Sequence, residues 1–273
     1  MFLITLGHPV LHDADGSPVC GLRRKDLALL IFLCLEGAGV HSRSRLASLL
    51  WGENPEERAR HSLTQALGRL GRALPAGVLA TDKESVRWAG GLACDANLLL
   101  GASRGEPWGE APWLYAGHFL EGFEAGRGAG DFADWADRRR VELRNTALRL
   151  LEAEGAAAEA EDGWERALRL GERAVEIDPF WEGGHRRILR ALAARGERNR
   201  ALRHYQAFEA WLMEEVGASP DPDTRALEKA LEDVLGFAVA IEHKGEGGDL
   251  RIRYQSLEQL DALCRRLRDS AER

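Results

Sequence analysis

The chain has 273 residues, enough for two or three domains, and its apolar content of 45% is that of a globular protein with well-formed cores. A formal net charge of −7 excludes a protein that coats nucleic acid along its whole length, although a local basic face is compatible with it. The four cysteines show no CxxC spacing, which argues against a metal site or a disulfide framework and favours a reducing, cytoplasmic location.

The first ninety residues predict a small sheet, helices and a hairpin. Residues 2–6 and 9–11 are β-prone, and residues 18–21 can pair back after the turn at 13–16. Apolar periodicity predicts a helix over residues 24–36, ended by Gly37, and another over 43–51 with Ser42 as its N-cap. Two strand-like runs, 78–81 and 85–88, flank a turn and predict a hairpin.

Residues 54–74 predict an amphipathic helix, with Asn54 as N-cap and Pro55 as the first helical residue. Its apolar face consists of Ala59, Leu63, Ala66, Leu67, Leu70, Ala73 and Leu74. The opposite face bears groups that can contact phosphates or base edges, namely Arg58, His61, Thr64, Gln65, Arg69 and Arg72. Taken alone, that face could also be an ordinary solvated helix surface.

A sheet, three helices and a terminal hairpin are the order of a winged helix-turn-helix domain, whose third helix enters the major groove and whose hairpin is the wing. This order favours DNA contact by the polar face of helix 54–74. Arg87 on the predicted wing is then a candidate phosphate or minor-groove contact, with a solvent-facing strand residue as the alternative.

The stretches LRRKDLALLIFLCLEGAGVHSRSRLASLLWGE and ARHSLTQALGRLGRAL resemble the winged-helix domain shared by response regulators and the Streptomyces antibiotic regulatory proteins. The resemblance covers about residues 1–98 and implies that helix 54–74 reads promoter DNA. Arg69 and Arg72 match basic positions of that family. Gly68 and Gly71 depart from it, and each costs up to about 1 kcal/mol of helix propensity.

Helices dominate from residue 131. We predict helices over residues 131–154, 162–176, 182–195, 198–216 and 222–235, the second begun by a capping box of Asp162 and Glu165. The run ALRL at 167–170 recurs as ALRH 34 residues later, and 34 residues is the period of tetratricopeptide repeats. Such repeats stack helix pairs and offer a concave surface to protein partners.

The same region resembles the bacterial transcriptional activation domain over about residues 95–230. The similarity lies in YAGHFLEGF at 115–123, in IDP at 177–179 followed by Glu182, His185 and Arg186, and in EEVGASP at 214–220. It implies a helical module that packs on the winged helix and contacts partners or RNA polymerase.

The tail, with strands at 237–243 and 250–255 and a last helix capped by Ser256, resembles the dimerisation domain of the chromosome-partitioning protein ParB. The similar stretches are DTRALEKALEDVLG and VAIEHKGEGGDLRIRYQSLEQLDALCRRL. The resemblance implies a dimer interface of Val239, Ile241, Leu250, Ile252, Leu260, Leu263 and Leu267. Folding back on the repeats is the alternative. Residues 219–235 fit both families, which indicates a fusion, natural or constructed, at that point.

The sequence therefore predicts a mainly α protein with small β parts. Its domains are a winged helix (1–98), tetratricopeptide-like helical repeats (99–222) and a ββα dimerisation unit (223–273). We expect a homodimeric, sequence-specific transcription regulator, an activator that binds double-stranded promoter DNA and RNA polymerase. No residue spacing points to an enzyme, a cofactor or a metal, and no signal peptide or membrane-length apolar run is recognisable. A repeat scaffold and a chromosome-partition adaptor are the alternative functions.

Overall fold

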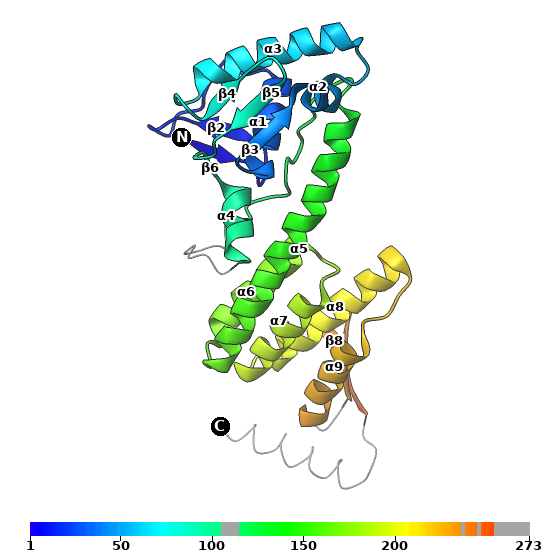
Figure 1. The fold of residues 1–273 in the computed structure, drawn as a ribbon. Coiled ribbons are helices and arrows are strands. Elements are labelled where there is room, and N and C mark those ends of the chain that lie inside the picture. Colours follow the sequence, from blue (N-terminus) through cyan, green and yellow to red (C-terminus); the bar gives the residue numbers. More distant parts are fainter. Residues whose placement is uncertain (105–114, 236–237, 245–246, 254–273) are drawn as a thin grey trace. The chain divides into compact units, whose positions relative to one another are not determined.

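A computed structural model describes residues 1–104, 115–235, 238–244 and 247–253, and the chain divides into two compact units, Met1–Leu151 and Glu152–Arg273 (Figure 1). The described residues are mainly helical with small sheets, as the sequence predicts. The first unit contains β1 (Phe2–Ile4), β2 (Val10–His12), α1 (Arg24–Glu36), β3 (Gly39–Ser42), α2 (Arg43–Trp51), α3 (Glu56–Ala73), β4 (Leu79–Thr81), β5 (Ser85–Trp88), β6 (Ala93–Cys94) and α4 (Asp95–Ala102).

Helix α1 is the centre of the first unit, since its residues 28–35 are all buried. Helices α2 and α3 pack against it and against each other. Such all-round burial explains why its sequence is a nearly continuous apolar run with little amphipathic pattern.

Two three-stranded sheets flank these helices, in the orders β2-β1-β6 and β3-β5-β4. The hairpin β4–β5 confirms the predicted wing, with Thr81 opposite Val86. Strands β3 and β6 are additions, and the expected strand at residues 18–21 is reduced to a single bridge between His12 and Pro18. Short strands of this kind form only because a partner strand supplies the hydrogen bonds, so local sequence signals them poorly.

The buried carboxylate of Asp95 ties β1 to α4. It accepts hydrogen bonds from the backbone nitrogens of Thr5 and Leu6, each at 2.9 Å, and from the Thr5 hydroxyl at 2.6 Å. A buried carboxylate with three such donors is fully compensated, and it joins the start of α4 to the segment that follows β1.

Helical pairs make up the second unit. Helix α5 (Gly130–Ala160) enters it, and α6 (Trp164–Ile177), α7 (Glu182–Ala194), α8 (Arg198–Val216) and α9 (Pro222–Leu235) follow. Helix α7 packs against α6, α8 and α9. The repeat-related residues Ala167 and Ala201 are both fully buried, which agrees with a helical-repeat fold.

Helices α5 and α6 differ from the predictions. Helix α5 continues to Ala160, six residues beyond the expected end. The predicted capping box at α6 is wrong, because Gly163 is the N-cap residue and Asp162 has a positive φ of 55° that turns its backbone away from a cap. Gly217 ends α8 in the left-handed conformation as expected, with φ of 66°.

A buried arginine holds α5 and α7 together. The Arg187 side chain donates to the carboxylates of Glu152 and Glu159, both at 2.9 Å, and it is fully buried. It crosses α5 at Gly155, where a Cβ atom would lie only 2.1 Å from the arginine Nε. The glycine is therefore required by the packing of a charged side chain, although glycine disfavours helices.

A histidine pair joins α7 to α8. His185 Nε2 lies 2.9 Å from the Pro179 carbonyl, and its Nδ1 lies 3.0 Å from His204 Nε2. The geometry fits two neutral rings, with His204 donating to His185 and His185 donating to the carbonyl. Burial lowers the pKa of both histidines. For His204, the charge of Arg200 and the repulsion that His185 would exert when protonated add to burial and bring the pKa to about 4.

Strands β7 (Ala238–Lys244) and β8 (Gly247–Arg253) form an antiparallel pair in the tail. Val239 is opposite Ile252, and Ile241 is opposite Leu250. Four members of the predicted dimer interface thus occupy matched positions in one hairpin, whereas Leu260, Leu263 and Leu267 lie outside the described residues.

Candidate nucleic-acid interface

Helix α3 is anchored through one apolar face, as predicted. Ala59, Leu63, Ala66, Leu67 and Leu70 are all buried. The helix starts one residue later than expected, with Pro55 at the N-cap position. The Asn54 backbone nitrogen donates to the Trp51 carbonyl, so Asn54 belongs to the preceding turn.

The opposite side of α3 presents an exposed stripe of side chains, which we call the reading stripe. Arg58, His61, Gln65 and Arg72 are exposed, and their spacing of three, four and seven residues places them in one row along the helix. His61 Nε2 and Gln65 Nε2 are 2.9 Å apart, so one side chain steadies the other. Gly68 falls within the same row and leaves it locally free of side-chain bulk.

Thr64 lies beside the reading stripe and connects α3 to α2. Its hydroxyl accepts a hydrogen bond from Arg43 at 2.6 Å and donates to the Arg60 carbonyl at 2.9 Å. Another nitrogen of Arg43 reaches the Asp82 carbonyl in the wing turn, at 3.4 Å. Thr64 is exposed, but its hydroxyl is occupied in linking three elements.

Arg69, one of the predicted DNA contacts, is engaged with α1 in the structure. Its guanidinium forms a two-pronged ion pair with Asp26 of α1, with Nε–Oδ2 at 2.6 Å and NH2–Oδ1 at 2.8 Å. The Asp26 side chain is fully buried and the Arg69 side chain is 21% exposed. Asp26 raises the pKa of Arg69 through this contact. The charge of Arg69 is thus balanced by Asp26, and the ion pair joins α3 to α1.

Arg87 lies in the middle strand of the wing sheet, opposite Val40 and Ala80, and is exposed. At the tip of the wing, Asp82 accepts hydrogen bonds from the Ser85 hydroxyl and from the backbone nitrogens of Glu84 and Ser85, and these lower its pKa. The turn is short and rigid, and it exposes Lys83. Lys83 was not among the predicted contacts, although a basic residue in a wing turn is a usable signal.

A hollow of about 240 Å³ adjoins the reading stripe at the start of α1. It is lined by Arg23, Arg24, Lys25, Asp26, Trp51, Ser62, Gln65 and Arg69. Lys25 is committed to the carbonyls of Leu50 and Arg127, at 2.6 and 2.7 Å. Arg23 and Arg24 are exposed and add positive charge beside Gln65. The consecutive basic residues 23–25 are a sequence signal that the prediction of DNA contacts did not include.

In the part of the chain that the structure describes, no three or more His, Cys, Asp or Glu side chains gather as metal ligands would. No described helix combines the length and apolar character needed to cross a bilayer.

Comparisons with known proteins match the chain to two domain families. Residues 102–232 match the bacterial transcriptional activator domain, and residues 220–268 match the ParB dimerisation domain. The chain therefore carries both domains, and the two matches overlap at residues 220–232, within the region where the sequence indicates a fusion.

Individual proteins are also similar to parts of this chain or share its fold. ParB, the chromosome-partitioning protein of two Caulobacter vibrioides strains, is 57% identical over 47 residues, which are 17% of this chain and 16% of ParB. This chain thus shares only a small part of ParB. The solved structure of Mycobacterium tuberculosis EmbR, in complex with a low affinity phosphopeptide, is 20% identical, with a TM-score of 0.60 over 92% of this chain and 77% of that one. The likeness shows a common fold.

Proposed function

We propose a mode of DNA binding for this chain, which matches the bacterial transcriptional activator domain over residues 102–232. Helix α3 enters the major groove of double-stranded promoter DNA, and the β4–β5 wing lies against the adjoining backbone. The observation that carries this proposal is the reading stripe, since α3 buries most of its apolar face and still presents a row of basic and amide side chains to solvent.

Each residue of the stripe has a role suited to its chemistry. Arg58 and Gln65 are the base readers, because guanidinium and amide groups can each form two hydrogen bonds to a base edge. His61 positions Gln65 through their 2.9 Å contact. Arg72, in the last turn of α3, binds phosphate. Arg87 contributes from the flank, where it is exposed on β5, whereas the Thr64 hydroxyl is held by Arg43 and supports the position of α3.

Selection of bound fragments from a random DNA library at two salt concentrations tests this proposal. A sequence motif that persists at the higher salt is expected. Recovery of no motif, with binding that vanishes as salt rises, would leave only non-specific phosphate attraction and would favour a protein-binding scaffold.

Variants then separate the two kinds of contact. Arg72→Ala should weaken binding to all sequences and reduce the salt slope by about 1. Gln65→Ala should change the preferred base at one position, by about 1–3 kcal/mol. Arg138→Ala is the matched control, since Arg138 is exposed on α5 and away from the stripe. An unchanged preference with Gln65→Ala removes that residue from base readout.

We also propose that the tail makes the chain a homodimer. A two-stranded hairpin is marginally stable alone, and the register of β7 and β8 places Val239, Ile241, Leu250 and Ile252 on one face of the ladder. Ile241→Glu should therefore give monomers by sedimentation, whereas the control Ala240→Glu, at the alternate register position, should not. A dimer that survives Ile241→Glu would place the contact elsewhere.

The ParB likeness supports one further candidate. A tail 57% identical to that of ParB over 47 residues can pair with ParB itself, which would make the chain a partition-linked adaptor. Mixing the two proteins and separating them by mass would reveal mixed dimers if this holds. We propose a cytoplasmic location, because the proposed ligand is promoter DNA. We also propose the helical repeats as the surface that contacts RNA polymerase.

A further inference from the structure

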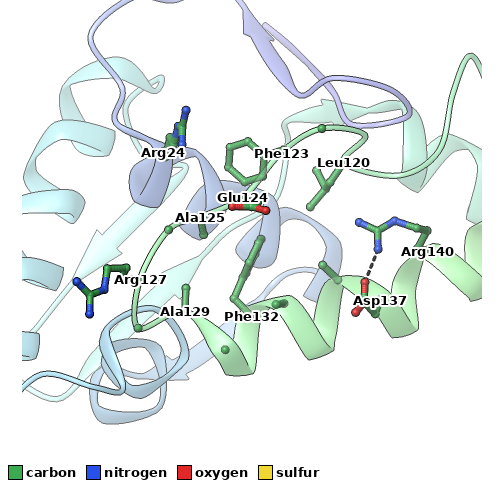
Figure 2. Close-up of a pocket in the computed structure, with 16 residues that line it drawn as sticks. Arg24, Leu120, Phe123, Glu124, Ala125, Arg127, Ala129, Phe132, Asp137 and Arg140 are labelled. Carbon is green, nitrogen blue, oxygen red and sulfur yellow. Dashed lines mark hydrogen bonds and ion pairs between the residues drawn. The ribbon is translucent and has the colours of Figure 1, made fainter.

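A cavity of about 700 Å³ lies between α1 and the start of α5 (Figure 2). Residues 122–130 and the first turns of α5 form most of it, and Arg24 of α1 closes one side. Its floor is apolar, made by the buried side chains of Leu120, Ala125, Ala129, Phe132 and Ala136 and the half-buried ring of Phe123. Its volume lies within the range of small-molecule sites.

The walls of this cavity are held in place by hydrogen bonds to their surroundings. The Gly128 carbonyl accepts from the Gly52 nitrogen at 2.9 Å, and the Arg127 carbonyl accepts from Lys25 Nζ at 2.7 Å. Positive φ angles of 67°, 92° and 75° at Gly122, Gly126 and Gly128 shape the loop between these contacts. Because the loop is fixed by groups outside the cavity, little has to be ordered when a ligand enters.

Charged groups surround the apolar floor. Arg140 is satisfied by Asp137 and, at 3.0 Å, by the Phe119 carbonyl. In the part of the chain that the structure describes, Arg24, Arg127 and Glu124 have no ion-pair partner. Figure 2 shows Glu124 near the centre, with Arg24 and Arg127 on the side opposite the Arg140–Asp137 pair. Two unpaired cations against one unpaired anion leave an excess of positive charge.

We propose that this cavity binds a small amphipathic molecule that carries an acidic group. The apolar part of the ligand covers Phe123 and Phe132, and its anionic group pairs with Arg24 or Arg127. The cavity combines Arg24 of the winged helix with residues 120–140 of the activator domain, so the ligand touches both domains. Arg24 also lines the hollow beside Gln65 and Arg69, which makes this cavity a place from which a ligand can influence the DNA-binding face.

Two fluorescent probes test the proposal on the full chain: anilinonaphthalene sulfonate, an aromatic anion, and phenylnaphthylamine, its uncharged relative. We expect saturable binding of one sulfonate probe per chain and weaker binding of the neutral one. Arg127→Gln should weaken sulfonate binding by about two- to fivefold, and Glu124→Gln should strengthen it by a similar factor, because exposed charges act at this scale. Arg138→Gln, an exposed arginine on α5 outside the cavity, should change nothing.

Ala133→Trp supplies an independent test, because Ala133 lines the cavity, is exposed and can be enlarged without disturbing a core. This variant should abolish saturable binding while the helical circular dichroism and its melting curve stay unchanged. The proposal is overturned if Ala133→Trp and Arg127→Gln both bind the sulfonate probe as the parent does. The claim that the ligand is acidic fails if Arg127→Gln strengthens sulfonate binding and Glu124→Gln weakens it. It also fails if the two probes bind equally well.

Discussion

Replacing Arg69 with alanine should destabilise the winged helix strongly. The change leaves the fully buried Asp26 carboxylate without its two guanidinium donors, at 2.6 and 2.8 Å. Stranding one member of a buried ion pair costs about 3–5 kcal/mol. The lower end of this range applies here for two reasons. Arg69 is 21% exposed, so water can reach the site when the side chain is removed, and the Arg23 backbone nitrogen still donates to Asp26 at 2.9 Å. A loss of about 3 kcal/mol is a large part of the stability of a domain.

Urea unfolding followed by tryptophan fluorescence, together with DNA titrations at several salt concentrations, measures both consequences. The double change Asp26→Leu with Arg69→Leu removes the stranded charge and should recover more than half of the loss. It should also keep the salt slope of DNA binding, whereas Arg72→Ala lowers that slope and leaves the urea midpoint unchanged. If Arg69→Ala instead lowers the slope as Arg72→Ala does, without moving the urea midpoint, Arg69 binds phosphate and our assignment is refuted.

Three further changes test other parts of the fold. Gly71→Ala should stabilise the protein by about 0.5–1 kcal/mol in urea titrations, because the position is exposed, helical and free of neighbours within 4 Å of an added Cβ; a loss of stability would contradict this. Gly155→Ala should cost about 3 kcal/mol or more in thermal melts, since its Cβ would lie 2.1 Å from Arg187 Nε, and an unchanged melt would show that the buried arginine is misplaced. Both His185 and His204 have pKa values below the ordinary 6.5, and that of His204 is about 4. Between these pH values the unfolded chain binds more protons than the folded chain, so the free energy of unfolding should fall as pH drops from 6.5 toward 4. His204→Gln should flatten that dependence, and an equal slope in this variant would exclude the pair as its cause.

The helices and the wing hairpin are predictable because their signals are local. Residues 24–36, 198–216 and 222–235 form helices with the predicted ends, since apolar periodicity and helix-stopping glycines act within a few residues of each other. The short strands β3 and β6 are not predictable in this way. They exist because β5 and β1, far away in the sequence, supply their hydrogen bonds.

The same distinction applies to the candidate interface. Periodicity separates the buried face of α3 from its polar face correctly, and it selects Arg58, His61, Gln65 and Arg72, which are all exposed. It cannot separate Arg69 from Arg72. Both are basic residues of one helix face, and only the approach of Asp26, 43 residues away, neutralises Arg69.

By itself, then, the sequence determined the kind of protein: a winged helix, an activator domain of helical repeats, and a ParB-like tail, each recognisable from local pattern and motif. The tertiary structure decided which polar groups are free to act. It engaged Arg69 with Asp26 and Thr64 with Arg43, and it enclosed Arg187 beside Gly155. It also assembled a cavity from Arg24 and residues 120–140. The physical reason is that a charge or a hydroxyl is available for binding only when no partner satisfies it, and those partners are distant in sequence.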